Sequence, residues 1–249
     1  MAHKDAEKGT HATAVKRNPR TILIAVLVLV VIAVTAVLVY RNNQQSKATH
    51  AEFTATQDEF SASETSYKEA SQKLANTADV CEELYASYNL CSALTTTHKE
   101  ITDSYSAVKE EVETIDSNNE ESLDDAITNL RSAISTIQEL DRKADDAVTA
   151  YEAALRKAVQ DEHSNLLNEA RTNLKEAKAL LSASEGKTSD EELWKAFSRV
   201  LNVHEKELDK NADVKGDDVD TYIASSDVLR VENAAILSTM NHLKGIYKE

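Results

Sequence analysis

The sequence predicts an all-α protein: an N-terminal transmembrane helix followed by long antiparallel helices that form one or two extracytoplasmic bundles of the coiled-coil or spectrin-like kind. The 249 residues include only one Pro and four Gly, whereas a sheet protein of this size needs many turns that recruit both. Ala, Leu, Glu and Lys, which favour helices, are abundant. Apolar residues recur at helical spacing along most of the chain.

Residues 21–40, TILIAVLVLVVIAVTAVLVY, predict the transmembrane helix. Twenty helical residues rise roughly 30 Å, the thickness of a bilayer core. Arg20 and Arg41 bracket this segment, and Tyr40 suits the membrane interface. The alternative is a cleaved signal peptide, whose apolar region is shorter, about 7–15 residues. We therefore expect an uncleaved anchor that contacts the lipid bilayer through residues 21–40.

Basic residues predict the orientation of this anchor. The tail, residues 1–20, has five Lys or Arg and two acidic residues, a net charge of +3, whereas the whole chain carries −15. The positive-inside rule places such a tail in the cytoplasm and residues 41–249 outside. The predicted location is the plasma membrane, crossed once. The acidic body repels nucleic acid, so nucleic acid is not an expected partner.

Residues 41–50, RNNQQSKATH, are polar and aperiodic and predict a short stalk. A seven-residue repeat then predicts a long amphipathic helix. The repeat comprises Phe53, Phe60, Tyr67, Leu74, Cys81 and Tyr88, with weaker companions Thr56, Ser63, Ala70, Thr77 and Leu84.

A second helix is predicted from apolar residues that alternate three and four apart. They are Leu94, His98, Ile101, Tyr105, Val108, Val112 and Ile115. The phase of this series does not continue that of the first helix, so we expect a turn near residues 87–89. The polar run at residues 116–119, DSNN, predicts the next break.

The third predicted helix begins near Ser122 or Leu123 and continues without a breaker to Leu181. At 1.5 Å per residue it approaches about 90 Å, so it either links two bundles or bends around residues 161–164. We assign residues 51–160 to a first bundle and 161–249 to a second that shares this helix. Its predicted apolar face comprises Ile127, Leu130, Ile134, Ile137, Ala144, Val148, Tyr151, Leu155, Leu166, Ala170, Leu174 and Leu181.

Two shorter helices complete the second bundle. Residues 182–189 predict a loop, and Ser189 with Glu192 matches a capping box that starts the fourth helix. That helix is expected to bury Leu193, Phe197, Val200, Leu201 and Leu208 beside Trp194. Residues 211–217 predict a turn, and the fifth helix carries Tyr222, Leu229, Ile236, Met240 and Leu243.

The loop in this region supports a resemblance. Residues 170–208 join a helix, a small-polar stretch, Gly186-Lys187, acidic residues and another helix. This stretch resembles the helical-hairpin repeats of membrane-anchored surface proteins from high-GC Gram-positive bacteria. It departs from them at Thr188 and Ser189, where an apolar residue is expected. The resemblance implies a location in the cell envelope and no particular activity.

No motif in the sequence predicts catalytic residues, a cofactor or a metal. Walker, Gly-x-Ser-x-Gly and dinucleotide motifs are absent, and no His has Glu three residues before it. His98 falls on an apolar seam, where a packed His is the commoner explanation. The acidic clusters at 110–111 and 120–125 are typical of a solvated face. Five tyrosines are expected to be half-buried: Tyr67, Tyr85, Tyr88, Tyr105 and Tyr151.

Cys81 and Cys91 are the only cysteines. In one continuous helix they would lie roughly 15 Å apart along the axis, too far for a disulfide, which needs Cα atoms within about 7 Å. With the predicted turn between them, they are expected to form a disulfide outside the cell. Two reduced cysteines in one long helix, or a bridge between two chains, are the alternatives.

These patterns predict a membrane-anchored interaction or spacer protein of the cell envelope, with an unspecified protein partner and no enzymatic activity. They are compatible with a homo-oligomer. One alternative is an extracytoplasmic sensor that signals through a cytoplasmic partner. Another is a division-type helical scaffold with reversed topology, which the distribution of basic residues opposes.

Overall fold

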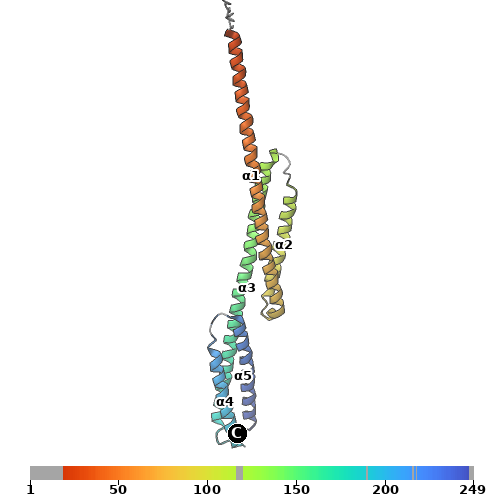
Figure 1. The fold of residues 1–249 in the computed structure, drawn as a ribbon. Coiled ribbons are helices and arrows are strands. Elements are labelled where there is room, and N and C mark those ends of the chain that lie inside the picture. Colours follow the sequence, from red (N-terminus) through yellow and green to blue (C-terminus); the bar gives the residue numbers. More distant parts are fainter. Residues whose placement is uncertain (1–18, 116–119, 189, 215, 217, 247–249) are drawn as a thin grey trace, which may run out of the picture. The chain divides into compact units, whose positions relative to one another are not determined.

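The computed structural model describes residues 19–115, 120–188, 190–214, 216 and 218–246, with side chains from residue 33 onward except those of 42, 120 and 121. These residues form long helices (Figure 1), which confirms the predicted all-α class and the helical-bundle character. The helices are α1 (Pro19–Leu84), η1 (Ala86–Tyr88), α2 (Cys91–Glu113), α3 (Glu120–Ala183), α4 (Glu191–Ala212) and α5 (Val219–Ile246).

Helix α1 runs without interruption through the predicted span and the predicted stalk. Of the predicted span, residues 21–32 lie outside the described side chains. Counting only the side chains that the structure describes, no helix has an apolar stretch long enough to cross a bilayer. Residues 33–40, the described remainder of the predicted span, are all exposed.

The chain divides into two compact units. Among the described residues, the first unit takes 19–61, 112–115 and 120–133. In it, α1 contributes buried Thr56 and half-buried Phe53 and Phe60. A charged pair, Arg131 Nη2 to Glu52 Oε1 at 2.7 Å, joins α3 to α1 within this unit. The α3 residues that it buries are Leu123, Ala126, Ile127, Leu130 and Ala133.

The second unit contains residues 62–111 and 134–249, and its described part begins with a helical hairpin. The seven-residue repeat predicts the buried face of α1 correctly, since Tyr67, Leu74 and Cys81 are at most 3% exposed. Leu84, the last residue of α1, is an exception because it is 63% exposed. Helix α2 buries Cys91, Leu94, Ile101 and Val108 as predicted.

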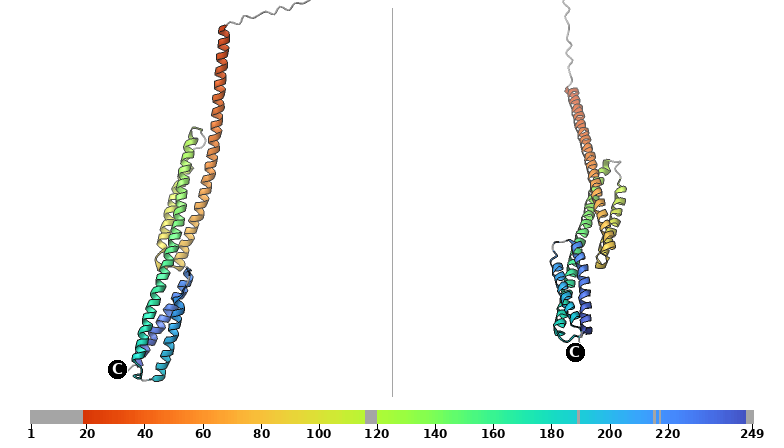
Figure 2. Two further views of the ribbon diagram at one scale, coloured as in Figure 1. Left: turned by 90° about the vertical axis from the view of Figure 1, so that its left-hand side faces the viewer. Right: turned by 60° about the horizontal axis from the view of Figure 1, so that its bottom comes forward.

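The C-terminal part of the same unit is a three-helix bundle of α4, α5 and the second half of α3, which lie side by side in Figures 1 and 2. Because α3 repeats apolar residues every three or four positions, one face supplies the core along its whole length. Leu167 is buried where Leu166 had been predicted. The core comprises Leu167, Ala170, Leu174, Ala177, Leu181, Leu201, Leu208, Leu229, Ile236, Met240 and Leu243.

Two predictions for α4 are wrong. Leu193 and Val200 are 38% and 39% exposed rather than buried, because they lie on the flank of α4 that faces away from α3. The predicted cap residue, Ser189, lies outside the described residues. The helix begins at Glu191, and the Asp190 side chain accepts a hydrogen bond from the Leu193 amide at 3.0 Å, which satisfies an otherwise unpaired donor at the helix start.

Candidate functional site

The turn between α1 and α2 is held by backbone hydrogen bonds and closed by a disulfide. It contains η1, and Asn89 adopts a left-handed conformation with φ of 58°, which Asn tolerates better than most residues. The Tyr88 and Asn89 amides donate to the carbonyls of Tyr85 and Ala86 at 3.0 and 3.1 Å. In the structure a disulfide joins Cys81 to Cys91 across this turn, with Cα atoms 5.5 Å apart.

Tyr88 connects this turn to the middle of α3. Its hydroxyl donates a hydrogen bond to a Glu162 carboxylate oxygen at 2.6 Å. Glu162 also pairs with Arg230 of α5, which in turn pairs with Asp227. Burial of the phenol, together with the hydrogen bond to the Glu162 carboxylate, raises the pKa of Tyr88 to about 12. The neutral, hydrogen-bonded phenol is therefore the form that the fold favours.

Tyr85 makes a second connection, because its hydroxyl donates to the Asp220 carboxylate at the start of α5, at 3.3 Å. Burial raises the pKa of Tyr85, and the Asp220 carboxylate raises it further. Both tyrosines of the turn thus face carboxylates from the C-terminal bundle. The two hydrogen bonds fix the turn against α3 and α5 at once.

The residue next to Glu162 continues this polar cluster into the core. His163 is 4% exposed, and its Nε2 lies 2.9 Å from the Asn211 carbonyl oxygen and 3.0 Å from the Ser225 hydroxyl. Ser225 Oγ donates in turn to Asn211 Oδ1 at 3.0 Å. The Tyr222 ring stands edge-on to the imidazole, with centroids 5.4 Å apart. Every polar atom named here has a partner, as a buried network requires.

We call the set Tyr85, Tyr88, Glu162, His163 and Arg230, with the residues that they bond, the polar joint. It gathers side chains from the α1–α2 turn, α3, α5 and the α4 terminus. Its side chains bond to one another across these elements, so the joint fastens the helices to each other. A groove of about 450 Å³ lies beside it, and Asp161, Glu162 and Glu169 make its lining acidic.

A smaller polar cluster lies between α1 and α2, farther from the α1–α2 turn. Tyr67 and Tyr105 stack with ring centroids 4.5 Å apart, and the Tyr67 hydroxyl donates to the Ile101 carbonyl at 3.2 Å. The Tyr105 hydroxyl donates to Glu64. This bond, followed by that from Lys68, lowers the pKa of Glu64. These contacts hold α1 against α2. Tyr105 is half-buried as predicted, whereas Tyr67, and Tyr151 on α3, are buried.

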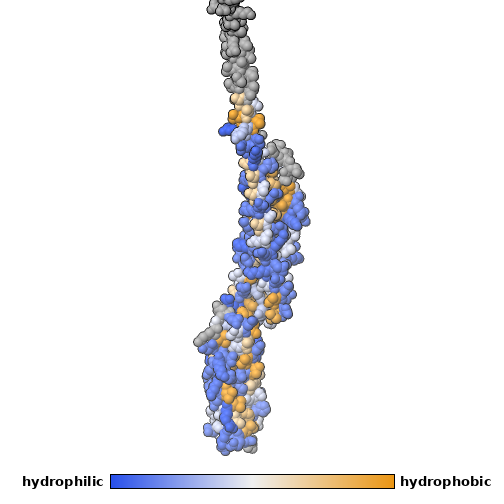
Figure 3. Space-filling view, in the orientation of Figure 1, coloured by the Kyte–Doolittle hydropathy of each residue, from blue (hydrophilic) through white to orange (hydrophobic). Residues whose placement is uncertain are grey.

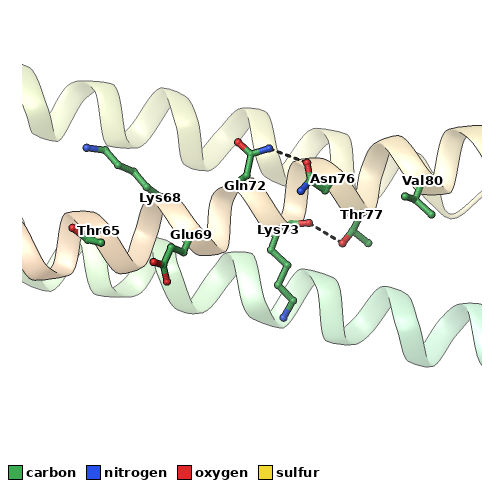
Figure 4. A pocket seen from close by; sticks show the side chains of 8 residues that line it. All are labelled: Thr65, Lys68, Glu69, Gln72, Lys73, Asn76, Thr77 and Val80. Carbon is green, nitrogen blue, oxygen red and sulfur yellow. Dashed lines mark hydrogen bonds between the residues drawn. The ribbon is translucent and has the colours of Figure 1, made fainter.

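A surface depression of about 820 Å³ runs along α1 and is lined by residues of that helix alone. Figure 4 shows Lys68, Glu69, Gln72 and Lys73 along it, between the ribbons of α2 and α3. Gln72 donates to Asn76 at 2.8 Å, and Thr77 donates to the Lys73 carbonyl at the same distance. The depression is wide open to solvent, and the exposed surface that lines it is mostly apolar.

The candidate ligands considered from sequence lie apart. His98 is half-buried on α2, Glu110 and Glu111 are exposed, and the side chains of Glu120 and Glu121 lie outside the described residues. Across the part of the chain that the structure describes, no group of three or more His, Cys, Asp or Glu residues could hold a metal ion.

The sequence reading missed His163 and Glu162. A signal was present for His163, which lies four residues after Val159 and four before Leu167 on the buried face of α3. A His on such a face needs buried partners. Glu162 gave no such signal, because its partners Tyr88 and Arg230 are 74 and 68 residues away in the chain.

No family model matches the chain, and comparisons with curated proteins and with solved structures find no similar protein.

Proposed function

We propose that this chain is a single-pass anchored interaction or spacer protein of the cell envelope, with residues 1–20 in the cytoplasm and residues 41–249 outside. The observation that carries this proposal is the disulfide between Cys81 and Cys91, the only two cysteines. Disulfides persist in oxidising compartments and are rare in the cytoplasm. The distribution of basic residues independently favours the same side of the membrane for these cysteines.

Helix α1 supports the anchoring role. It is one continuous helix of 66 residues that contains both the apolar segment 21–40 and the Cys81 end of the hairpin. The proposed anchor and one helix of the disulfide-closed hairpin are therefore parts of the same helix.

The polar joint supports a binding or spacing role over catalysis. Its acids, imidazole and phenols are engaged with one another, whereas a catalytic group needs access to a substrate proton. The polar joint bonds the α1–α2 turn to α3 and α5. Such bonds suit a spacer or binding protein, which needs a rigid helical structure. The expected partner is another protein of the envelope, bound on the surface of the helical body.

The disulfide also bears on the rival interpretations. A division-type scaffold with reversed topology would place Cys81 and Cys91 in the reducing cytoplasm, where a structural disulfide is not expected. A sensor shares the proposed topology but would in addition have to act through a partner in the cytoplasm. The spacer or interaction role requires no such partner.

Extraction of membranes with alkaline carbonate tests the anchor. The full chain should stay in the membrane pellet, and a variant lacking residues 21–40 should be released. Mass spectrometry of the pelleted protein should find the peptide from residues 1–20. Release of the full chain, or loss of that peptide through cleavage, contradicts the proposal.

A further inference from the structure

The outer face of the C-terminal bundle carries an exposed apolar strip. On α4, Leu193, Val200 and Val203 are 38%, 39% and 57% exposed, and on α5, Val228 and Val231 are 41% and 67% exposed. Figure 3 shows apolar surface gathered over this part of the molecule. Exposed apolar residues that gather on one face mark an interaction surface.

The contacts of each helix place both halves of the strip on one face. Helix α4 meets α3 through Glu205, which pairs with Lys178, and meets α5 through His204, which lies 2.5 Å from Glu232. An α-helix turns by about 100° per residue. Around the axis of α4, Glu205 is therefore followed by His204, then by Val200 and Val203, which lie on the side away from α3. On α5, Arg230 faces α3 and Glu232 faces α4, and Val228 and Val231 lie past Glu232 in the same way.

Charged residues of opposite sign flank the two halves of the strip. Beyond Val203, the outer edge of α4 carries Arg199, Lys206 and Lys210, whereas the outer edge of α5 carries Asp220 and Asp227. Within the bundle, Lys210 pairs with Glu207, Asp227 pairs with Arg230 and Asp220 accepts from Tyr85. With these partners counted, the α4 edge keeps a net charge of +3 − 1 = +2 and the α5 edge a net charge of −2 + 1 = −1.

We infer that a second copy of this chain covers the strip, in a two-fold dimer with the two α4 helices parallel. A two-fold axis along the bundle sets α4 of one copy opposite α5 of the other at the same level. The contacts of His204 with Glu232 and of Asn211 with Ser225 place Asp227 at a level between Lys206 and Lys210. The basic edge of each copy then meets the acidic edge of its partner.

The alternative two-fold arrangement, with the axis across the bundle, sets α4 against α4 of the partner. It brings Arg199 and Lys206 together with the same residues of the other copy and disfavours association through like charges. Charge therefore selects the parallel dimer. The inference goes beyond the proposed function and does not depend on it, because dimerisation through this face requires no particular membrane topology.

Light scattering coupled to size-exclusion chromatography of the full chain in detergent tests the dimer. The wild-type chain should be a dimer, and V203E/V231E should be monomeric, with a dissociation constant raised by more than about tenfold because two carboxylates would be buried. The control V80E changes an exposed valine on α1, 46% exposed, and should remain dimeric. Circular dichroism melts that match the wild type show that the variants are folded.

A monomeric wild-type chain, or a dimer that survives V203E/V231E, overturns the inference. Mixed cross-linking tests the arrangement. Chains with Lys206→Cys and chains with Asp227→Cys, carrying different tags, should link to one another under mild oxidation more than each links to itself. Preferential linkage of Lys206→Cys chains to themselves would show α4 against α4 and would contradict the parallel dimer.

Discussion

The Tyr88 hydroxyl lies 2.6 Å from a carboxylate oxygen of Glu162, so the turn that the Cys81–Cys91 disulfide closes is hydrogen-bonded to the middle of α3. Two residues 74 positions apart thereby connect the helical hairpin to the C-terminal bundle of the second unit. If the polar joint acts as a fastening, its removal should cost stability and leave the helices intact.

Tyr88→Phe removes the hydroxyl and keeps the ring. We expect a loss of about 1–2 kcal/mol in the free energy of unfolding, because the bond is made to a charged acceptor. Tyr85→Phe is the matched control, and its effect should be smaller since its bond to Asp220 is longer, 3.3 Å. Chemical denaturation measures both. Equal midpoints for Tyr88→Phe and the wild type would show that the bond contributes nothing.

The pH dependence of this difference follows from the pKa of Tyr88, which is raised from 10.0 to about 12. The folded state favours the neutral phenol, so its contribution is fully present below the unfolded pKa and is lost as pH rises towards the folded pKa. The stability difference between wild type and Tyr88→Phe should therefore shrink from about pH 10 to about pH 12. A difference that stays constant across this window argues against the coupling.

The double variant Cys81→Ala/Cys91→Ala removes the disulfide that closes the α1–α2 turn. Closing so short a loop is worth less than about 3 kcal/mol in the chain-entropy estimate, and we expect a loss of that order or below. Peptide mapping without reductant should recover the two cysteines as one linked pair from a single chain. Two free thiols in freshly isolated protein would refute the intramolecular bridge, and a link between two chains would replace it.

Sequence periodicity was enough to predict most of the fold. The repeat through Tyr67, Leu74 and Cys81 marks the buried face of α1, and its loss of phase before Leu94 marks the turn. Periodicity alone does not distinguish apolar residues that are buried in the core from apolar residues that are exposed on another face of the same helix. Leu193 and Val200 were assigned to the core of α4 because they are apolar and suitably spaced, yet they lie on its outer flank.

The polar joint was less accessible to sequence reasoning for a different reason. Hydrogen bonds such as those of Glu162 with Tyr88 and Arg230 depend on which helices meet at one level. The position along the bundle at which two such residues meet depends on the lengths of α1, α4 and the turns that follow them. The start of α4 is set locally, because the Asp190 side chain accepts a hydrogen bond from the Leu193 amide.

His163→Ala should be more damaging than a change at the surface. It leaves the Asn211 carbonyl and the Ser225 hydroxyl without their buried partner and opens a cavity, so we expect a loss of about 2–4 kcal/mol. His50→Ala, at an exposed position of α1, is the control and should be near neutral. A loss at His163 no larger than that at His50 would mean that the network does not stabilise the bundle.

The central claim is that the helical body lies outside the membrane, and protease added to intact cells tests it most directly. With epitope tags at both ends of the full chain, the C-terminal tag should be lost from intact cells while the N-terminal tag survives, and lysis should expose both. If the C-terminal tag survives in intact cells and disappears only after lysis, the body is cytoplasmic and the account is contradicted.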